Sequence, residues 1–164
     1  MDEQNKLITH QMAIAANENI KEKEYWLDNL SDAPVEPKTG LPYDHVHAGD
    51  AGSTLQEVKF QFPPPLCQRL MKLRNNNDVR LNMVLLTGIT VLLSRYTGSD
   101  DIIAGMPIYK QEQDIEFINT VLPVRTRVGE NATFKELLLS IRETIGKAVE
   151  HQNFPFPVLM EQLH

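Results

Sequence analysis

The stretch RLNMVLLTGITVLLSRYTGSDDIIAGMPI, residues 80–108, decides the fold of this chain. Its first half predicts a helix, because apolar residues recur at three- and four-residue spacing. These residues are Leu81, Val84, Leu85, Ile89, Leu92 and Tyr96. Other apolar residues fill most of the remaining circumference, so we expect the helix to be buried on several sides. We also expect it to be too short and too polar at its ends to cross a bilayer. Thr97-Gly98 ends it, since glycine takes the left-handed conformation at no steric cost.

Two strands are expected after this helix. Residues 102–106 predict an interior strand, and residues 117–128 alternate as a second strand would, with Asn119 and Arg125 on one face. Polar side chains on a face next to the core are candidate site residues. Pro123 cannot donate a hydrogen bond to a neighbouring strand, so the second strand is at an edge, bulged, or briefly unpaired there. A central helix that feeds a central strand predicts an α/β fold, with a mixed sheet backed by helices.

The N-terminal third is less regular. Residues 1–30 form a leading helical segment, in which Tyr25-Trp26 is expected to pack the helix onto the sheet. Residues 31–53 form an irregular connection rich in proline and glycine, of a length typical of a functional loop or a surface wrap. His45 and His47 lie there beside acidic residues, but a zinc site takes about four ligands and no third can be named. We therefore predict a solvated loop and no metal.

An alternating segment and a basic helix follow this connection. Residues 57–62 predict a half-buried strand, with valine and two phenylalanines facing inward. Prolines end this strand and open a helix over residues 66–75, in which Cys67 is expected to be a packing residue. This region holds the one local basic cluster, formed by Arg69, Lys72, Arg74 and Arg80. The cluster is either a solvated helix face or a docking patch for an acidic partner.

The C-terminal segment carries strong helix signals. Thr133 and Glu136 form a capping box, and an apolar stripe follows as far as Val149. His151 ends this helix and has two interpretations, a general base or a helix-capping histidine. We favour the capping role, because no acidic partner lies near it in the sequence. Residues 157–163 predict a short last helix.

Composition and charge limit the class of protein. The chain has 164 residues, 41% of them hydrophobic and 23% charged, which is typical of one soluble globular domain. A single cysteine excludes an internal disulfide and, with no signal peptide evident, favours a cytoplasmic location. The net charge of −6 disfavours nucleic acid as a partner, and we expect no membrane partner.

Several motifs together resemble the condensation domains of nonribosomal peptide synthetases. FINTVLPVR at residues 117–125 resembles the family's F-V-N-T-L-P-L-R, and HQNFPF at residues 151–156 resembles its H-Q-D-x-P-F. The family order is also kept by YW at residues 25–26, LPYD at 41–44, LLSRYTG at 92–98 and GMPI at 105–108. The loop at residues 110–114 is shorter than the family's, and Glu116 stands where an aromatic residue is usual.

The resemblance implies a fold and a set of site residues. Residues 1–164 would form the C-terminal lobe of a condensation domain, a single CoA-dependent-acyltransferase-like lobe of the chloramphenicol-acetyltransferase superfamily. The residues that match family motifs or would face the substrate tunnel are Asn119, Thr120, Arg125, His151 and Gln152. The family assigns catalysis to H-H-x-x-x-D-G on the first lobe, and this motif does not occur here. No catalytic residue can therefore be named, and the sequence leaves open whether the chain is itself an enzyme.

Two functions are compatible with this resemblance. In the first, the chain is a partial domain that is not catalytic alone and serves in docking, assembly or dimerisation. In the second, it is the acceptor-side half of an active condensation enzyme, whose first lobe is supplied elsewhere. The implied partners are other synthetase domains, carrier proteins or a second copy of the chain. No cofactor is expected, because phosphopantetheine would arrive only as the arm of a partner carrier protein.

Overall fold

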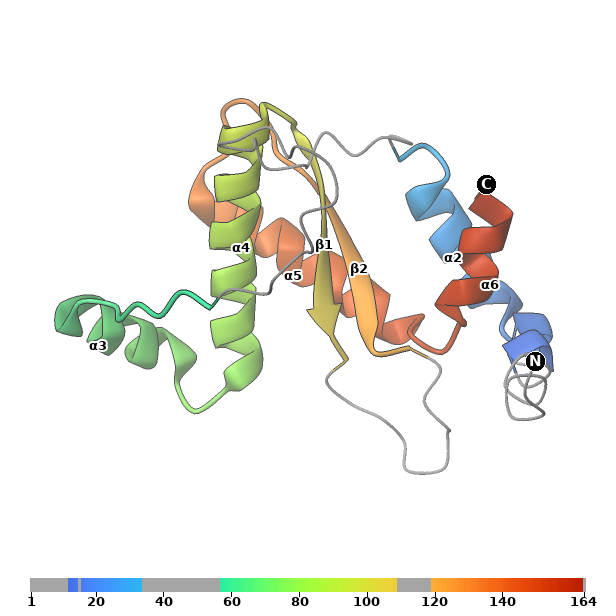
Figure 1. Cartoon of the computed structure of the whole chain (residues 1–164), viewed down its shortest axis with the longest axis horizontal. Helices are drawn as coiled ribbons and strands as arrows, with labels where there is room; N and C mark the ends of the chain where they lie inside the picture. Colours follow the sequence, from blue (N-terminus) through green and yellow to red (C-terminus); the bar gives the residue numbers. More distant parts are fainter. Residues whose placement is uncertain (1–11, 15, 34–56, 109–118, 164) are drawn as a thin grey trace.

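The computed structural model describes residues 12–14, 16–33, 57–108 and 119–163 (Figure 1). Two strands lie at the centre of these residues, with helices around them. The elements are α2 (Ile20–Leu30), α3 (Pro64–Arg74), α4 (Asp78–Thr97), β1 (Asp101–Pro107), β2 (Val121–Arg127), α5 (Phe134–Glu150) and α6 (Phe156–Leu163). The α/β architecture predicted from the sequence, a sheet backed by helices, is confirmed. The loop that carries His45 and His47, predicted to be solvated, lies outside the described residues.

The two strands pair in antiparallel fashion. Ile102 lies opposite Thr126, and Met106 lies opposite Leu122. β1 was predicted to be interior, but in the described part of the chain β2 is its one sheet neighbour. Pro123 lies opposite Gly105, and β2 has no described strand on its other side. Of the three alternatives predicted for Pro123, an edge, a bulge or a locally unpaired strand, the edge position is the one found among the residues that the structure describes.

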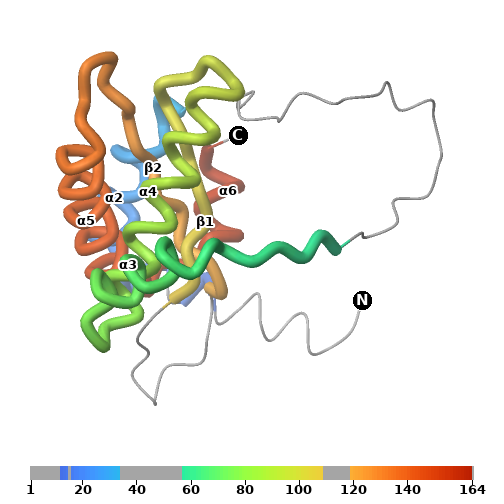
Figure 2. The backbone as a smooth tube through the Cα atoms, turned by 90° about the vertical axis from the view of Figure 1, so that its left-hand side faces the viewer, coloured from blue at the N-terminus to red at the C-terminus, as the bar shows by residue number. Residues whose placement is uncertain are grey.

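The main core lies between the strands and α5. Figure 2 shows α5 running along one side of the strand pair, and α5 contacts both β2 and α4. Leu122 and Val124 are buried on that side, where Ile141 and Ile145 are also buried. The predicted capping box fixes the start of α5, because the Thr133 side chain accepts from the Glu136 N–H and the Glu136 carboxylate accepts from the Thr133 N–H.

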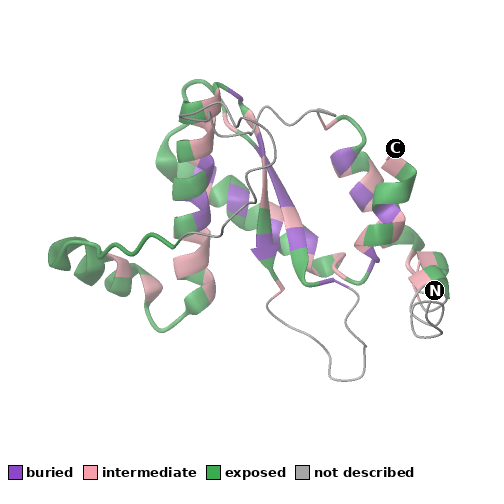
Figure 3. Ribbon diagram, in the orientation of Figure 1, coloured by how far each residue is buried: buried purple, intermediate pink, exposed green. Residues whose placement is uncertain are grey.

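The side of α4 that faces the core differs from the prediction. The helix ends where the sequence predicts, because Gly98 follows it in the left-handed conformation with a φ of 69°. The buried residues, however, are Leu86, Thr87 and Thr90. Figure 3 shows the buried part of α4 on its side toward the strands. The predicted apolar stripe lies mainly on the opposite side, where four large residues are exposed; we call Leu85, Ile89, Leu92 and Tyr96 the outer stripe of α4. The expectation of burial on several sides was wrong for the described part of the chain, because the contacts of α4 with β1, α5 and α3 leave its outer stripe exposed.

By length and composition alone, α4 is long enough and apolar enough to cross a membrane. It has 20 residues and a mean hydropathy of 1.2, so the expectation that it is too short and too polar was wrong on that count. The helix packs on β1 and α5 with one side and leaves its outer stripe exposed. One such helix is weak evidence for a membrane span.

Residues 57–62 do not form the predicted strand. Val58 is 85% exposed and Phe60 is 75% exposed, and the rings of Phe60 and Phe62 contact each other edge to face. A half-buried strand needs a neighbouring strand, and none lies beside this segment among the described residues. The helix after it forms as α3 but has no buried residue. Both views show α3 and the preceding segment projecting from the strands (Figures 1 and 2).

Candidate functional site

Asn119, a predicted site residue, holds the turn between α5 and α6. It is 5% exposed, and its side-chain amide donates to the carbonyls of Gln152 (3.0 Å) and Phe154 (2.6 Å). Its Oδ1 accepts from the Phe156 N–H at 2.9 Å. One amide thus satisfies three backbone groups of the turn and joins the two sequence motifs that contain these residues.

The same turn is held from the other side by α2. The Trp26 side chain is fully buried, and its Nε1 donates to the carbonyl of His151 at 2.8 Å. The ring of Tyr25 stacks on the His151 imidazole, with centroids 4.2 Å apart. We predicted that Tyr25-Trp26 packs α2 onto the sheet. Trp26 shares one buried core with Leu122 and Val124 of β2, and the ring contacts of the pair are with this turn and with Phe156 of α6.

His151 is the C-cap residue of α5, the position that the sequence predicted. Its Nδ1 lies 2.8 Å from the Lys147 carbonyl oxygen, one of the last carbonyls of the helix. A general base normally has an orienting partner on its second ring nitrogen. No described carboxylate hydrogen-bonds this ring, so the geometry is that of a cap.

Arg125 forms an ion-pair cluster that joins α2 to the strands. Its Nε donates to both carboxylate oxygens of Asp101 at 2.9 and 3.1 Å, and the guanidinium also pairs with Asp32. Its Nη1 donates to the Asn29 carbonyl at 2.6 Å, which satisfies a backbone acceptor at the end of α2. The side chain is 6% exposed. We call Arg125, Asp101, Asp32 and Asn29 the arginine cluster.

The charges of the arginine cluster stabilise one another. The hydrogen bond from Arg125 to Asp101 is the main cause that raises the pKa of Arg125, although burial of the guanidinium acts in the opposite direction. The hydrogen bond from Arg125 is likewise the main cause that lowers the pKa of Asp32. Both groups therefore remain ionised at neutral pH, and Arg125 is fully engaged in holding the fold.

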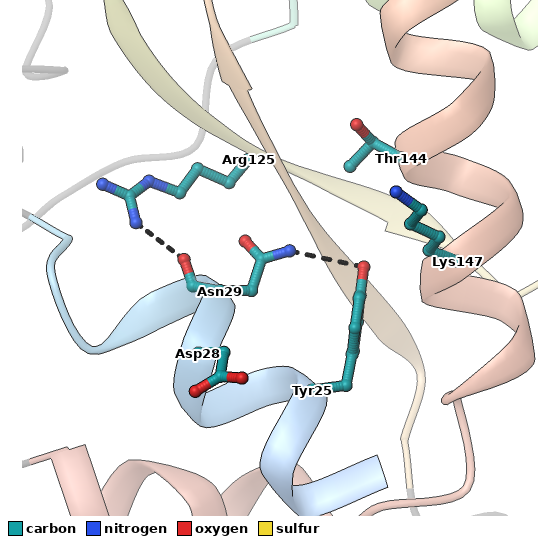
Figure 4. A pocket seen from close by; sticks show the side chains of 6 residues that line it. All are labelled: Tyr25, Asp28, Asn29, Arg125, Thr144 and Lys147. Atoms are coloured by element: carbon teal, nitrogen blue, oxygen red, sulfur yellow. Dashed lines mark hydrogen bonds between the residues drawn. The ribbon is translucent and has the colours of Figure 1, made fainter. Parts of the chain in front are cut away.

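A pocket of about 280 Å³ lies between α2, β2 and α5 (Figure 4). It is lined by Tyr25, Asp28, Asn29, Arg125, Thr144 and Lys147. Burial raises the pKa of Tyr25, so its phenol is neutral and accepts a hydrogen bond from Asn29. The Lys147 ammonium pairs with Glu143 at 2.7 Å. The lining thus has polar groups, but most are already bonded to other residues of the chain.

The other predicted site residues lie apart from these clusters or on their rim. Thr120 is exposed, and Gln152 contributes its carbonyl to Asn119. In the basic cluster, Arg74 pairs with Asp78 at 2.6 Å. The other three cations are exposed and make no ion pair with a described residue; they are Arg69, Lys72 and Arg80. Within the described ranges, no group of three His, Cys, Asp or Glu residues could hold a metal ion.

Sequence reasoning missed Asp32, Asp101 and Asn29 as partners of Arg125. Asp32 lies 93 residues from Arg125 in the chain, and Asp101 lies 24 residues away. Asp101 could have been inferred as a partner from antiparallel pairing of the two predicted strands. In that pairing Arg125 lies opposite Ile103, only two residues from Asp101. No local pattern marks Asp32.

Substitution of Asn119 by alanine is expected to destabilise the chain. The change removes a buried partner from Gln152, Phe154 and Phe156, and each unsatisfied buried group costs about 1–3 kcal/mol. We expect a loss of about 2–4 kcal/mol in the free energy of unfolding in urea. The neighbouring Thr120→Ala, at an exposed position, serves as the control and should change it by less than about 0.5 kcal/mol. Equal stability of the two variants would contradict the role given to Asn119.

Acid should weaken the arginine cluster. Since the pKa of Asp32 is lowered in the folded state, its contribution is present at neutral pH and is lost as the pH falls below about 4. Asp32→Asn should therefore be less stable than the wild type at pH 7, and the gap should close in acid. The measurement is the urea midpoint of both proteins from pH 7 to pH 3, with Asp28→Asn as a control of equal charge. A gap that stays constant with pH would contradict this assignment.

Comparison with known proteins agrees with this architecture. The Condensation domain family model matches residues 6–164. The chain is 34% identical over 158 residues to bacitracin synthase 1 of Bacillus licheniformis, covering 92% of this chain and 3% of that protein. It is 30% identical over 162 residues to gramicidin S synthase 2 of Brevibacillus brevis, covering 95% of this chain and 4% of the other.

Solved structures with the same fold are also condensation domains. The condensation domain of the Monacolin K polyketide synthase MokA matches with a TM-score of 0.61 at 22% identity, covering 98% of this chain and 38% of that one. The starter condensation domain of the rhizomide synthetase RzmA matches with a TM-score of 0.61 at 17% identity, covering 97% and 34%. The chain thus spans about a third of these structures and only a few per cent of the synthetases. By the match over nearly its whole length, the chain belongs to the Condensation domain family.

Proposed function

We propose that this chain is a lobe of a condensation domain that is not catalytic alone and serves in docking or assembly within a synthetase. The observation that carries the proposal is the bonding of its motif residues. Asn119 and His151 bind the α5–α6 turn, and Arg125 is saturated by the arginine cluster. Side chains held in this way maintain the shape of the lobe, and none of the three is oriented by a partner for proton transfer.

A second function is favoured by the share of a condensation domain that the chain covers. It matches about a third of each condensation-domain structure, and its sequence has no H-H-x-x-x-D-G motif. In a complete domain, the histidine of that motif would assist attack of an acceptor amine on a donor thioester. The chain would then be the acceptor-side half of an active enzyme, completed by a first lobe.

The isolated chain should form no amide bond between carrier-bound aminoacyl thioesters. The reason is that its motif histidine has no partner acid among the described residues and is bonded as a helix cap. The assay mixes purified chain with loaded donor and acceptor carrier proteins and follows the product by mass spectrometry, with an enzyme-free sample as the control. Product above that background, abolished by His151→Ala but not by Thr120→Ala, would overturn the proposal.

The same assay separates the two functions. A first lobe carrying H-H-x-x-x-D-G is added, and the rate is compared with that of the first lobe alone. Product that requires both polypeptides would favour the acceptor-side half. No product from the mixture, although the two polypeptides bind each other, would favour docking or assembly.

The exposed cations of α3 supply a surface for an acidic carrier protein. Arg69 and Lys72 lie three residues apart on α3, so they share a side of the helix. Arg80 lies in the first turn of α4, which α3 contacts. These cations have no ion pair with a described residue, so their charge is available to steer an anionic partner.

Reversal of two of these charges should weaken carrier binding. Exposed charge pairs contribute about 0.2–1 kcal/mol each, so Arg69→Glu with Lys72→Glu should weaken binding about tenfold at low salt and less at high salt. Calorimetric titration with a loaded carrier protein measures this effect. The matched control is Lys135→Glu with Arg142→Glu, which reverses two exposed charges on α5. If both double variants bind as the wild type does, or if no protein binds, the cluster is only a solvated face.

A further inference from the structure

Asp32, just beyond the end of α2, is held between two arginines of β2. Arg125 and Arg127 are two residues apart, so they share one face of the strand. One carboxylate oxygen of Asp32 accepts from Nη1 of Arg125, and the other accepts from Nη2 of Arg127 at 2.6 Å. Arginine N–H groups on both oxygens of one carboxylate are the arrangement by which proteins bind carboxylate and phosphate groups.

Asp32 is the exposed carboxylate of this group. Its side chain is 61% exposed, whereas those of Arg125 and Asp101 are 6% and 17% exposed. Asp101 is placed by β1 and also accepts from Nε of Arg125, so it is a fixed part of the site. An exposed ion pair such as that of Asp32 is weak and is screened by other ions. A dissolved anion can therefore reach the position that Asp32 occupies.

The charges around Asp32 favour an anion at this position. Without its carboxylate, the two guanidinium groups face the carboxylate of Asp101 alone, which leaves one net positive charge. Nη2 of Arg127 would also lose its one hydrogen-bond acceptor among the described residues. The hydrogen bond from Arg125 is the main cause that lowers the pKa of Asp32, so the site favours the charged form of the group that it holds.

We infer that Arg125 and Arg127 form an oxyanion-binding site, which Asp32 occupies as an internal ligand and for which an external carboxylate or phosphate competes. An external oxyanion bound there would detach the Asp32 side chain from β2, while the Asn29 carbonyl still accepts from Nη1 of Arg125. The occupant of the site would thus determine how tightly the chain just after α2 is held. This inference does not depend on the proposed docking role.

The first test empties the site. Asp32→Ala removes the internal carboxylate, and acetate supplies the same chemical group in solution. Urea unfolding of this variant is measured at pH 7 in acetate, in inorganic phosphate and in chloride, each at the same ionic strength. A ligand that binds only the folded chain raises the folding equilibrium constant, by a factor that grows with its concentration relative to Kd. We expect a rise of about fivefold or more over chloride for the variant, and about twofold or less for the wild type, whose site is filled.

Two matched variants separate binding from general salt effects. Phosphate stabilises most folded proteins, because it is excluded from their surface. Asp32→Ala combined with Arg127→Gln lacks the second arginine and should respond no more than the wild type does. Asp28→Ala removes a carboxylate one turn earlier on α2, which makes no ion pair with a described residue, and it should also respond as the wild type does.

Circular dichroism checks that each variant is folded in chloride. If Asp32→Ala is unfolded there, its refolding in acetate or phosphate would support the inference equally well, and no refolding in either would contradict it.

The second test measures competition with Asp32 directly. The Nε–H signal of Arg127 is followed by NMR as inorganic phosphate is added to the wild type and to Asp32→Ala. We expect the signal of the variant to shift at phosphate concentrations about tenfold or more below those that the wild type requires. The reason is that an internal carboxylate competes at a high effective concentration.

Three results would overturn the inference. They are no response of Asp32→Ala to either oxyanion, a response that survives Arg127→Gln, and equal phosphate titrations of the wild type and Asp32→Ala. Asp32 would then only join α2 to β2 as an ion pair. A response to acetate alone or to phosphate alone would support the site and restrict it to carboxylates or to phosphate groups.

Discussion

The pairing of Arg125 with Asp101 is the interaction on which the arrangement of α2 depends. A buried guanidinium is tolerated only where its charge and its N–H groups are satisfied, and Asp101 supplies a carboxylate that accepts from both Nε and Nη2. The remaining N–H groups then fix the end of α2 through Asn29 and Asp32. A two-stranded sheet is marginal by itself, so this tie to a helix also supports the strands.

The turn between α5 and α6 depends in the same way on one amide. Asn119 can serve as donor and acceptor at once, which is what a turn with two inward carbonyls and one inward N–H requires. Trp26 closes the other side of this turn. Asn119 and His151, which match family motifs, thus stabilise this turn through their hydrogen bonds.

Most element positions could be predicted from the sequence, because they depend on local signals. The capping box of α5, Gly98 after α4 and the alternation of β2 all act through residues near one another in the chain. The buried side of α4 could not be predicted, since apolar residues occur around most of the helix and the neighbours decide which side is covered. Thr87 is accommodated in the core because its hydroxyl bonds back to the Met83 carbonyl at 2.7 Å. The arginine cluster was missed for a similar reason, as Asp32 meets Arg125 only through tertiary packing.

The burial of Trp26 allows the position of α2 to be followed by intrinsic tryptophan fluorescence. It is the one tryptophan of the chain, and its indole lies in the core with its N–H bonded to the α5–α6 turn. An indole in such an apolar environment emits at shorter wavelength than one in water. The emission maximum therefore indicates whether α2 is packed against the core. Detachment of this helix would shift the emission to the red even while α4 and α5 stay helical. Fluorescence and far-ultraviolet dichroism together can therefore distinguish local release of α2 from global unfolding without any added label.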